Sequence, residues 1–233
     1  MNRTTYLMGD SRVRKLTPNN LPIAKTWTRP GTKIYDLYEV VDGELSELTD
    51  NAIDPPLVLV SAGICDLTIK QKSRIQGGQH EEVTVIPAEQ NEELINNTCE
   101  ALDDLQRFIA RQGAIPILST IYPMGLLDWN ATRLNRGKTS VLYKADQYPS
   151  MQANLEYLTE EVNNKIVELN INNNVKTPLI HKCLRHNRGG GRKVSYRYNL
   201  LEDGCHPSNS LVNDIVKTLS RNIQLNRMSL NQY

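Results

Sequence analysis

A serine near the start of the chain and an aspartate–histidine pair near its end are residues that could together perform nucleophilic catalysis. Ser11 follows a Gly-Asp dipeptide, and Asp203 and His206 stand at the two ends of the segment DGCH. A serine is a weak nucleophile until a base removes its proton, and the base works best when a carboxylate orients it. Histidine titrates near neutral pH and suits that task. We therefore expect Ser11 as nucleophile, His206 as base and Asp203 as the orienting acid.

Alternating strands and helices would bring these distant residues to one edge of a sheet. Apolar strands are predicted at residues 4–8, 57–63 and 114–121, with a further candidate at 178–183. Amphipathic helices are predicted at residues 91–112, at 151–170 and from residue 208 onward. This alternation predicts one three-layer α/β domain over residues 1–233, with a parallel sheet of about five strands and helices on both faces. Sites in such sheets lie at the carboxyl ends of the strands, which is where Ser11 stands.

Other stretches have no clear periodicity. Residues 12–16 would form a short helix after Ser11, and three basic residues there indicate an exposed face. A second element through Ile34 and Val40 is interpreted as a helix. Residues 69–90 indicate a surface excursion, because they contain a Gly-Gly pair among polar residues, and residues 124–149 indicate a long polar loop.

Four sequence blocks resemble those of the SGNH or GDSL-like hydrolase superfamily over nearly the whole chain. They are YLMGDSRV, RPGTKIYDL, LVLVSAGICDLT and EDGCHPS, in the family's order. The resemblance implies a flavodoxin-like α/β fold and the Ser11, His206 and Asp203 triad. It also implies an oxyanion hole built from Ser11, Gly31 and position 65, and no metal or cofactor. The implied activity is that of an esterase on a small acyl or acetyl ester.

Position 65 departs from the family pattern, which is G-x-N-D in the third block. The sequence has Cys65 where the asparagine amide would donate to the oxyanion. A thiol is only a weak donor, so activity could be low or absent. The alternative function is therefore a weak or inactive interaction domain that binds RNA or a protein. Cys65 as the nucleophile is the least favoured alternative, because nothing beside it in the sequence supplies a base.

A basic segment at residues 181–201 is the candidate binding surface in that alternative. Its basic residues stand among Tyr196 and Tyr198 without an acid, and those proposed to bind nucleic acid are Arg185, Arg188, Arg192, Lys193 and Arg197. Basic loops with aromatics can follow a phosphate backbone and stack bases. We expect the segment from Arg185 to Arg197 to be exposed and mobile. A looser resemblance to SGNH domains of invertebrate retroelement and virus-like reading frames points the same way.

Composition narrows the class of protein further. The 233 residues carry a formal net charge of +1, which favours neither nucleic acid nor membrane surfaces globally. Four cysteines without metal-ligand spacing are interpreted as free thiols in a reducing compartment. The N-terminal residues MNRTTYLMGDS contain no apolar stretch long enough for a signal peptide, and no run of the sequence is apolar over the length of a membrane span. We therefore expect an intracellular, cytoplasmic protein.

Overall fold

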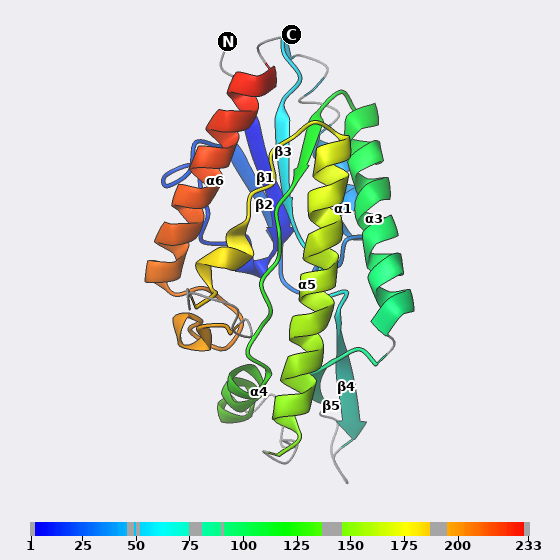
Figure 1. Cartoon of the computed structure of the whole chain (residues 1–233), viewed down its shortest axis with the longest axis vertical. Helices are drawn as coiled ribbons and strands as arrows, with labels where there is room; N and C mark the ends of the chain where they lie inside the picture. The colour runs from blue at the N-terminus through cyan, green and yellow to red at the C-terminus, as the bar shows by residue number, and fades with distance from the viewer. Residues whose placement is uncertain are drawn as a thin grey trace.

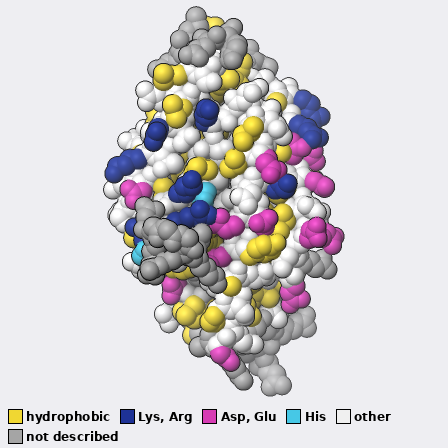
Figure 2. Space-filling view, viewed as in Figure 1, with side chains coloured by type: hydrophobic (Ala, Val, Ile, Leu, Met, Phe, Trp, Pro, Cys, Tyr) yellow, Lys and Arg dark blue, Asp and Glu magenta, His cyan; other side chains and the backbone are white. Residues whose placement is uncertain are grey.

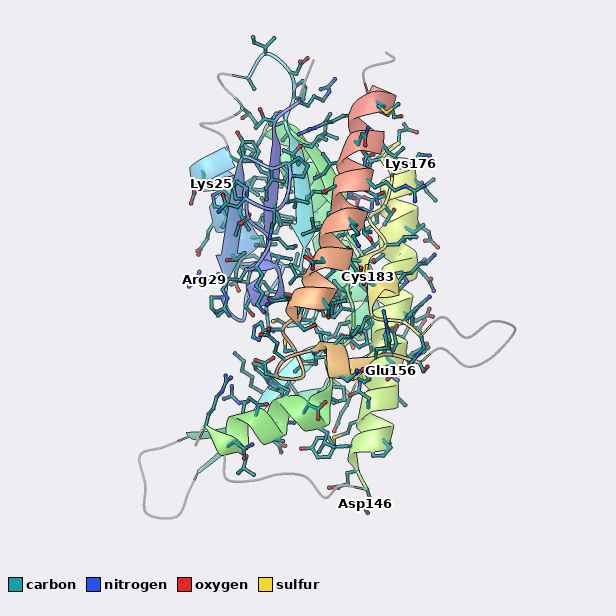
Figure 3. All side chains as sticks on the ribbon, turned by 90° about the vertical axis from the view of Figure 1, so that its left-hand side faces the viewer. Lys25, Arg29, Asp146, Glu156, Lys176 and Cys183 are labelled. Atoms are coloured by element: carbon teal, nitrogen blue, oxygen red, sulfur yellow. The ribbon has the colours of Figure 1, made fainter. Side chains whose placement is uncertain are left out.

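A four-stranded parallel sheet forms the centre of the computed structural model. The structure describes residues 3–45, 49, 52–74, 81–89, 91–136, 146–186 and 195–230. The strand order is β2 (Lys25–Arg29), β1 (Thr5–Asp10), β3 (Leu57–Ser61) and β6 (Ile115–Leu118). β2 is an outer strand, and Figure 3 shows its ends at Lys25 and Arg29. The parallel sheet with helices around it confirms the predicted α/β class.

Side chains of β1 alternate between two hydrophobic clusters, one on each face of the sheet. Tyr6 and Met8 belong to one cluster, and Leu7 belongs to the other. The first face is covered by α1 (Leu37–Val40), the π-helix η2 (Val41–Leu45), α3 (Asn91–Arg111) and α5 (Tyr148–Asn172). The second face is covered by η1 (Ser11–Val13), η3 (Ile180–Cys183) and α6 (Asn209–Leu230). The helices of the two faces stand on either side of the sheet (Figure 1).

The long helices form where the spacing of apolar residues predicts them. In α3 the buried residues Leu102, Leu105 and Ile109 follow the three- and four-residue spacing of one helical face. In α6 the buried Leu211 and Ile215 are the first two of an apolar row spaced by four residues. No helix in the described part of the chain is long and apolar enough to cross a membrane.

One strand assignment from the sequence was wrong, and one strand was missed. In the described part of the chain the sheet has four strands, close to the predicted number of about five. The candidate strand at residues 178–183 is instead the short 3-10 helix η3. The strand β2 was missed, because Trp27 is its only buried residue and an edge strand with one buried side chain gives little pattern.

A hairpin and a helix lie beyond the sheet, at the lower end of the molecule in Figure 1. The hairpin pairs β4 (Thr68–Arg74) with β5 (Glu81–Pro87), and it overlaps the region 69–90 that was predicted as a surface excursion. The helix α4 (Leu126–Asn135) lies in the region predicted as a polar loop. The sequence signal for α4 is weak, since Gly125 gives no side-chain cap and only Leu126 and Asn130 are buried in it.

Buried asparagines on the helices hold neighbouring segments through paired hydrogen bonds. Each one donates to the carbonyl and accepts from the amide of a single residue. The described pairs are Asn130 with Val85, Asn163 with Ile121, Asn170 with Leu118 and Asn226 with Lys176. An asparagine amide can match a peptide group in this way, because it has both a donor and an acceptor. These side chains therefore anchor helices to backbone that would otherwise be unpaired.

Asn163→Ala is expected to lower the free energy of unfolding by about 2–4 kcal/mol, because it leaves the buried amide and carbonyl of Ile121 without partners. Both of these hydrogen bonds measure 2.7 Å. Urea denaturation followed by circular dichroism measures the change. Asn164→Ala, on the exposed side of the same helix, is the matched control and should stay within about 0.5 kcal/mol. Equal effects of the two variants would contradict the role given to the Asn163 pair.

Candidate active site

The structure brings Ser11, His206 and Asp203 into one chain of hydrogen bonds. His206 Nε2 lies 2.9 Å from Ser11 Oγ, and His206 Nδ1 lies 2.8 Å from Asp203 Oδ2. The other carboxylate oxygen, Asp203 Oδ1, accepts from the amides of Cys205 and His206 at 3.1 and 2.8 Å. These distances allow the imidazole to take the serine proton while the carboxylate orients it.

The charge of Asp203 decides which ring nitrogen of His206 carries the proton. Burial by itself raises the pKa of the Asp203 carboxyl, but the bonds from the His206 side chain and from backbone amides outweigh it and lower that pKa to about 2. The carboxylate is therefore ionised at neutral pH and can only accept hydrogen bonds. It follows that Nδ1 carries the proton and that Nε2 is free to accept from the Ser11 hydroxyl.

Ser11 stands immediately after β1, where that strand approaches its neighbour closely. A side chain at Gly9 would put its Cβ 2.2 Å from the Ser61 carbonyl oxygen, so only glycine fits there. Asp10 then caps the short helix η1, because its carboxylate accepts from the Arg12 amide at 2.9 Å. The serine is thus the first residue of a tightly fixed turn.

A buried ion pair flanks Ser11 on both sides in sequence. Arg12 and Asp10 are 4% and 1% exposed, and Arg12 Nη2 lies 2.7 Å from Asp10 Oδ2. The guanidinium also donates to the Tyr122 carbonyl at 2.8 Å and lies over the Tyr122 ring. Burial opposes the charge on Arg12, but Asp10 more than compensates and raises its pKa. The prediction of an exposed basic face was wrong for Arg12, and an ion pair two residues apart leaves no clear sequence pattern.

Lys15 connects the turn after β1 with the segment that carries His206. Its ammonium lies 2.5 Å from Glu202 Oε1 and donates to the Pro207 carbonyl at 3.0 Å. Both partners stand beside the Asp203–His206 turn. This contact therefore joins two segments at the site that are far apart in the sequence.

The helix α4 forms a wall of the site that the sequence did not predict. The Gly125 amide donates to the Gly204 carbonyl at 2.7 Å, which places the start of α4 on the Asp203–His206 turn. Gly204 has φ 81°, and a Cβ there would lie 2.4 Å from the Trp129 amide nitrogen. The close approach brings the Trp129 ring edge-on to the His206 ring, with centroids 5.7 Å apart. Trp129 therefore limits the space beside the imidazole.

Register in the sheet places the other predicted oxyanion residues on both sides of Ser11. β1 pairs with β2 through Asp10 and Arg29, and Gly31 follows β2 by two residues. β1 also pairs with β3, which Cys65 follows in the chain. The loops that carry Gly31 and Cys65 thus begin at the two strands next to the serine. Burial raises the pKa of the half-buried Cys65 thiol to about 11, which keeps it protonated at neutral pH.

Asp66 joins the loop of Cys65 to the loop of Gly31. Both of its carboxylate oxygens face the Ile34 amide, at 3.4 and 3.3 Å. Burial raises the pKa of Asp66 to about 6, although the Ile34 amide and Lys33 work in the opposite direction. The carboxylate therefore holds the two loops together at a cost in free energy when it is charged.

The described part of the basic segment does not form an exposed surface of the kind predicted. Arg185 forms an ion pair with Glu160, and Tyr196 is 8% exposed with its hydroxyl bonded to the same glutamate. Tyr198 donates to Glu156, which Figure 3 shows on α5. Arg197, half-buried, donates to the Cys183 carbonyl at 2.7 Å. The expectation of exposure was wrong for Arg185, Tyr196 and Arg197.

The remaining predicted binding residues, Arg188, Arg192 and Lys193, lie outside the described residues. Basic side chains stand next to a histidine in the middle of the face seen in Figure 2. Tyr196 is 8% exposed, so its ring offers little surface on which a base could stack. The described residues thus give no support to binding of nucleic acid.

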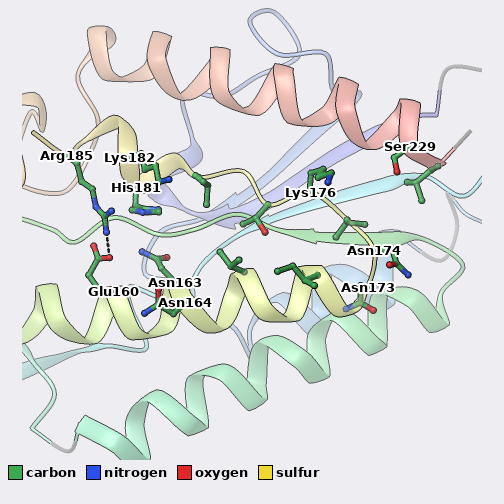
Figure 4. Close-up of a pocket in the computed structure, with 16 residues that line it drawn as sticks. Glu160, Asn163, Asn164, Asn173, Asn174, Lys176, His181, Lys182, Arg185 and Ser229 are labelled. Carbon is green, nitrogen blue, oxygen red and sulfur yellow. Dashed lines mark hydrogen bonds and ion pairs between the residues drawn. The ribbon is translucent and has the colours of Figure 1, made fainter. Parts of the chain in front are cut away.

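A groove of about 1250 Å³ lies between α5 and the segment after it, and Figure 4 shows its lining. It contains the Glu160–Arg185 ion pair and His181, and its lining does not include Ser11, Asp203 or His206. Burial lowers the pKa of His181 to about 3, so this ring is neutral at physiological pH. Its Nδ1 lies 2.8 Å from the Thr120 hydroxyl, which accounts for its buried position. The groove is therefore separate from the site described above.

Comparison with solved structures identifies the fold. No protein-family model matches the chain, and no curated protein matches it at a significant level. A GDSL-like lipase from Bacteroides thetaiotaomicron aligns with TM-score 0.61 and 12% identity, over 96% of this chain and 89% of that one.

Two esterases of known structure align in the same way. An acetyl xylan esterase has TM-score 0.54 and 14% identity, over 92% of this chain and 97% of its own. A variant of an acetyl-xylooligosaccharide esterase from Geobacillus has TM-score 0.54 and 12% identity, over 95% and 94%. The chain therefore has the SGNH or GDSL-like hydrolase fold. The looser resemblance to retroelement and virus-like proteins receives no support from these structures.

Arg12→Met is expected to lower the free energy of unfolding by about 3–5 kcal/mol, because it leaves the Asp10 carboxylate buried without a counter-charge. Adding Asp10→Asn should recover part of that loss, since asparagine keeps the helix cap without a charge. Urea denaturation of the single and double variants measures both changes. Arg14→Met, at an exposed position of the same turn, is the control. A double variant no more stable than Arg12→Met would refute the ion-pair argument.

Asp66→Asn is expected to stabilise the protein more at neutral than at acid pH. The folded-state pKa of about 6 lies above the ordinary 3.8, so the wild type loses stability as pH rises through this window. The loss amounts to about 3 kcal/mol. The asparagine variant lacks this loss, and its advantage in unfolding free energy should grow by about 2.4 kcal/mol between pH 4 and pH 7.5, because a small part of the loss is already present at pH 4. Asp214→Asn, on the exposed side of α6, is the control; an advantage independent of pH would contradict the assignment.

Proposed function

We propose that the chain is a single-domain serine hydrolase that cleaves esters of small acyl groups. The observation that carries this proposal is the hydrogen-bond chain from Ser11 through His206 to Asp203, with distances of 2.9 and 2.8 Å. A serine hydroxyl hydrogen-bonded to an imidazole nitrogen is set up to become a nucleophile. The carboxylate keeps the imidazole in the tautomer that this step needs.

The proposed reaction has two stages that both pass through an oxyanion. Ser11 Oγ attacks the ester carbonyl carbon while His206 Nε2 takes the hydroxyl proton. The carbon–oxygen bond to the leaving alcohol then breaks, and that alcohol receives the proton from His206. A water molecule next attacks the acyl-serine with His206 again as base, which releases the carboxylic acid and restores the Ser11 hydroxyl.

The proposed oxyanion hole has two amide donors, those of Ser11 and Gly31, and lacks a strong third one. Their loops begin at adjacent strands, and the loop of Cys65 begins at the strand on the other side of β1. The Cys65 thiol is a weak donor, and removal of one good donor typically costs about 10²–10³ in rate. We therefore infer a slow esterase rather than an inactive one.

The substrate class is inferred from the walls of the site and from the structural neighbours. Trp129 stands against the His206 ring and leaves limited room beside the imidazole. The aligned structures include a lipase and enzymes described as esterases of acetylated xylan and xylooligosaccharides. A small acyl group fits both observations. Neither observation selects the alcohol part of the ester.

Labelling with a fluorophosphonate probe tests the nucleophile directly. The wild type should form one covalent adduct at Ser11, and Ser11→Ala should form none, because the probe reacts with an activated serine. Intact-mass measurement and peptide mapping locate the adduct. Ser208→Ala, which changes another serine close to His206 in sequence, is the control and should still label. Labelling that survives Ser11→Ala would contradict the proposal.

Cys65→Asn is expected to raise kcat for p-nitrophenyl acetate by about 10- to 100-fold, because it adds an amide donor to the oxyanion hole. The gain should lie mostly in kcat, since the oxyanion forms only in the transition state. Cys99→Asn, at a half-buried cysteine of α3, is the control. An unchanged rate in Cys65→Asn, together with loss of activity in Ser11→Ala, would mean that position 65 does not face the oxyanion.

A further inference from the structure

Lys70 places a positive charge against the loop of Gly31. The residue lies on β4, in the hairpin that follows Cys65 and Asp66 in the chain. A Cβ built on Gly31 would lie 3.3 Å from Lys70 Nζ. Standard backbone geometry then puts the ammonium within about 6 Å of the Gly31 amide nitrogen, which is one of the two proposed oxyanion donors.

The same ammonium lies within electrostatic range of Cys65. Burial and the Asp10 charge raise the pKa of the Cys65 thiol, whereas the charges of Arg12 and Lys70 act to lower it. Lys70 therefore acts on both of the loops that flank Ser11. This is the region where the amide of an asparagine at position 65 would have acted.

The charge of Lys70 is not neutralised by a neighbour in the described part of the chain. No described carboxylate lies within 4.0 Å of its ammonium, and its side chain is exposed. By contrast, Arg12 is paired with Asp10, and Arg29 lies 3.5 Å from Glu39. Lys70 thus differs from these neighbours in having its charge available to a substrate.

The backbone that carries Lys70 is fixed in position. Lys70 pairs across the hairpin with Val85, which is 6% exposed. Asn130 of α4 accepts from the Val85 amide at 3.0 Å and donates to its carbonyl at 2.9 Å. The strand position that bears the ammonium is therefore held by the same helix that packs on His206.

We propose that the Lys70 ammonium stabilises the oxyanion of the hydrolytic reaction and partly replaces the amide missing at position 65. This inference rests on the proposed esterase function. The oxyanion would lie about 3 Å from the Gly31 amide, and so within about 9 Å of the ammonium. A unit charge at such a distance, in a site between water and protein interior, changes the rate on the order of tenfold. Such an effect belongs to the transition state and not to binding of a neutral ester.

Kinetics of Lys70→Met with p-nitrophenyl acetate, a neutral ester, test the proposal. We expect kcat to fall about tenfold with KM changed less than about twofold, because only the transition state carries the charge. Lys70→Arg should keep most of the wild-type kcat. Lys217→Met, which removes an exposed lysine on α6, is the matched control and should leave kcat unchanged. Thermal denaturation establishes that each variant is folded at the assay temperature.

A double-variant cycle adds a second readout. In the Cys65→Asn background, the loss of kcat caused by Lys70→Met should be smaller, because the added amide performs the same task. An unchanged kcat in Lys70→Met overturns the proposal, and so does a change confined to KM. If the wild type shows no turnover that depends on Ser11 and no fluorophosphonate adduct, the esterase function itself fails. That result differs from an active, labelled enzyme in which Lys70→Met has no effect.

Discussion

Ser11 stands between two residues, Asp10 and Arg12, whose charges are buried against each other. Each charge is tolerated only because the other is present, and together they fix the turn after β1. Arg12 also reaches the Tyr122 carbonyl, so the loop after β6 is placed relative to the same turn. Lys15 then ties the turn to the segment that carries His206. The geometry around the serine thus depends on one ion pair that the protein must keep intact.

The sequence was informative where a residue pattern repeats or where chemistry demands certain residues. Apolar spacing predicted the long helices and the central strands, and the positions of Ser11, Asp203 and His206 predicted that they would meet. It was uninformative where structure depends on single contacts between distant residues. The helix α4 exists because Asn130 pairs with Val85 and because Gly204 lets Gly125 approach, and neither contact has a local signature.

In the basic segment the error was of the opposite kind, because a clear local pattern predicted an exposed surface that the structure does not have. A run of cations with interleaved tyrosines is typical of an exposed strip when read without its neighbours. The acids that bind Arg185 and the two tyrosines are on α5, which comes earlier in the chain. Glu156 and Glu160 lie one helical turn apart, so both face the same segment. The pairing between these two glutamates and the basic segment could not be predicted, because the two segments are far apart in the sequence.

The asparagine pairs that anchor the helices are neutral amides, and this separates the framework from the rim of the site in its response to salt. Counter-ions screen exposed charges within about 10 Å at moderate ionic strength, but they act little on buried amides or on a buried ion pair. The framework bonds of Asn163 and Asn170 are made by buried amides, and Asp10 and Arg12 form a buried ion pair. Lys70, in contrast, is exposed to solvent. Salt therefore screens the charge of Lys70 while it leaves the framework around Ser11, Asp203 and His206 nearly untouched.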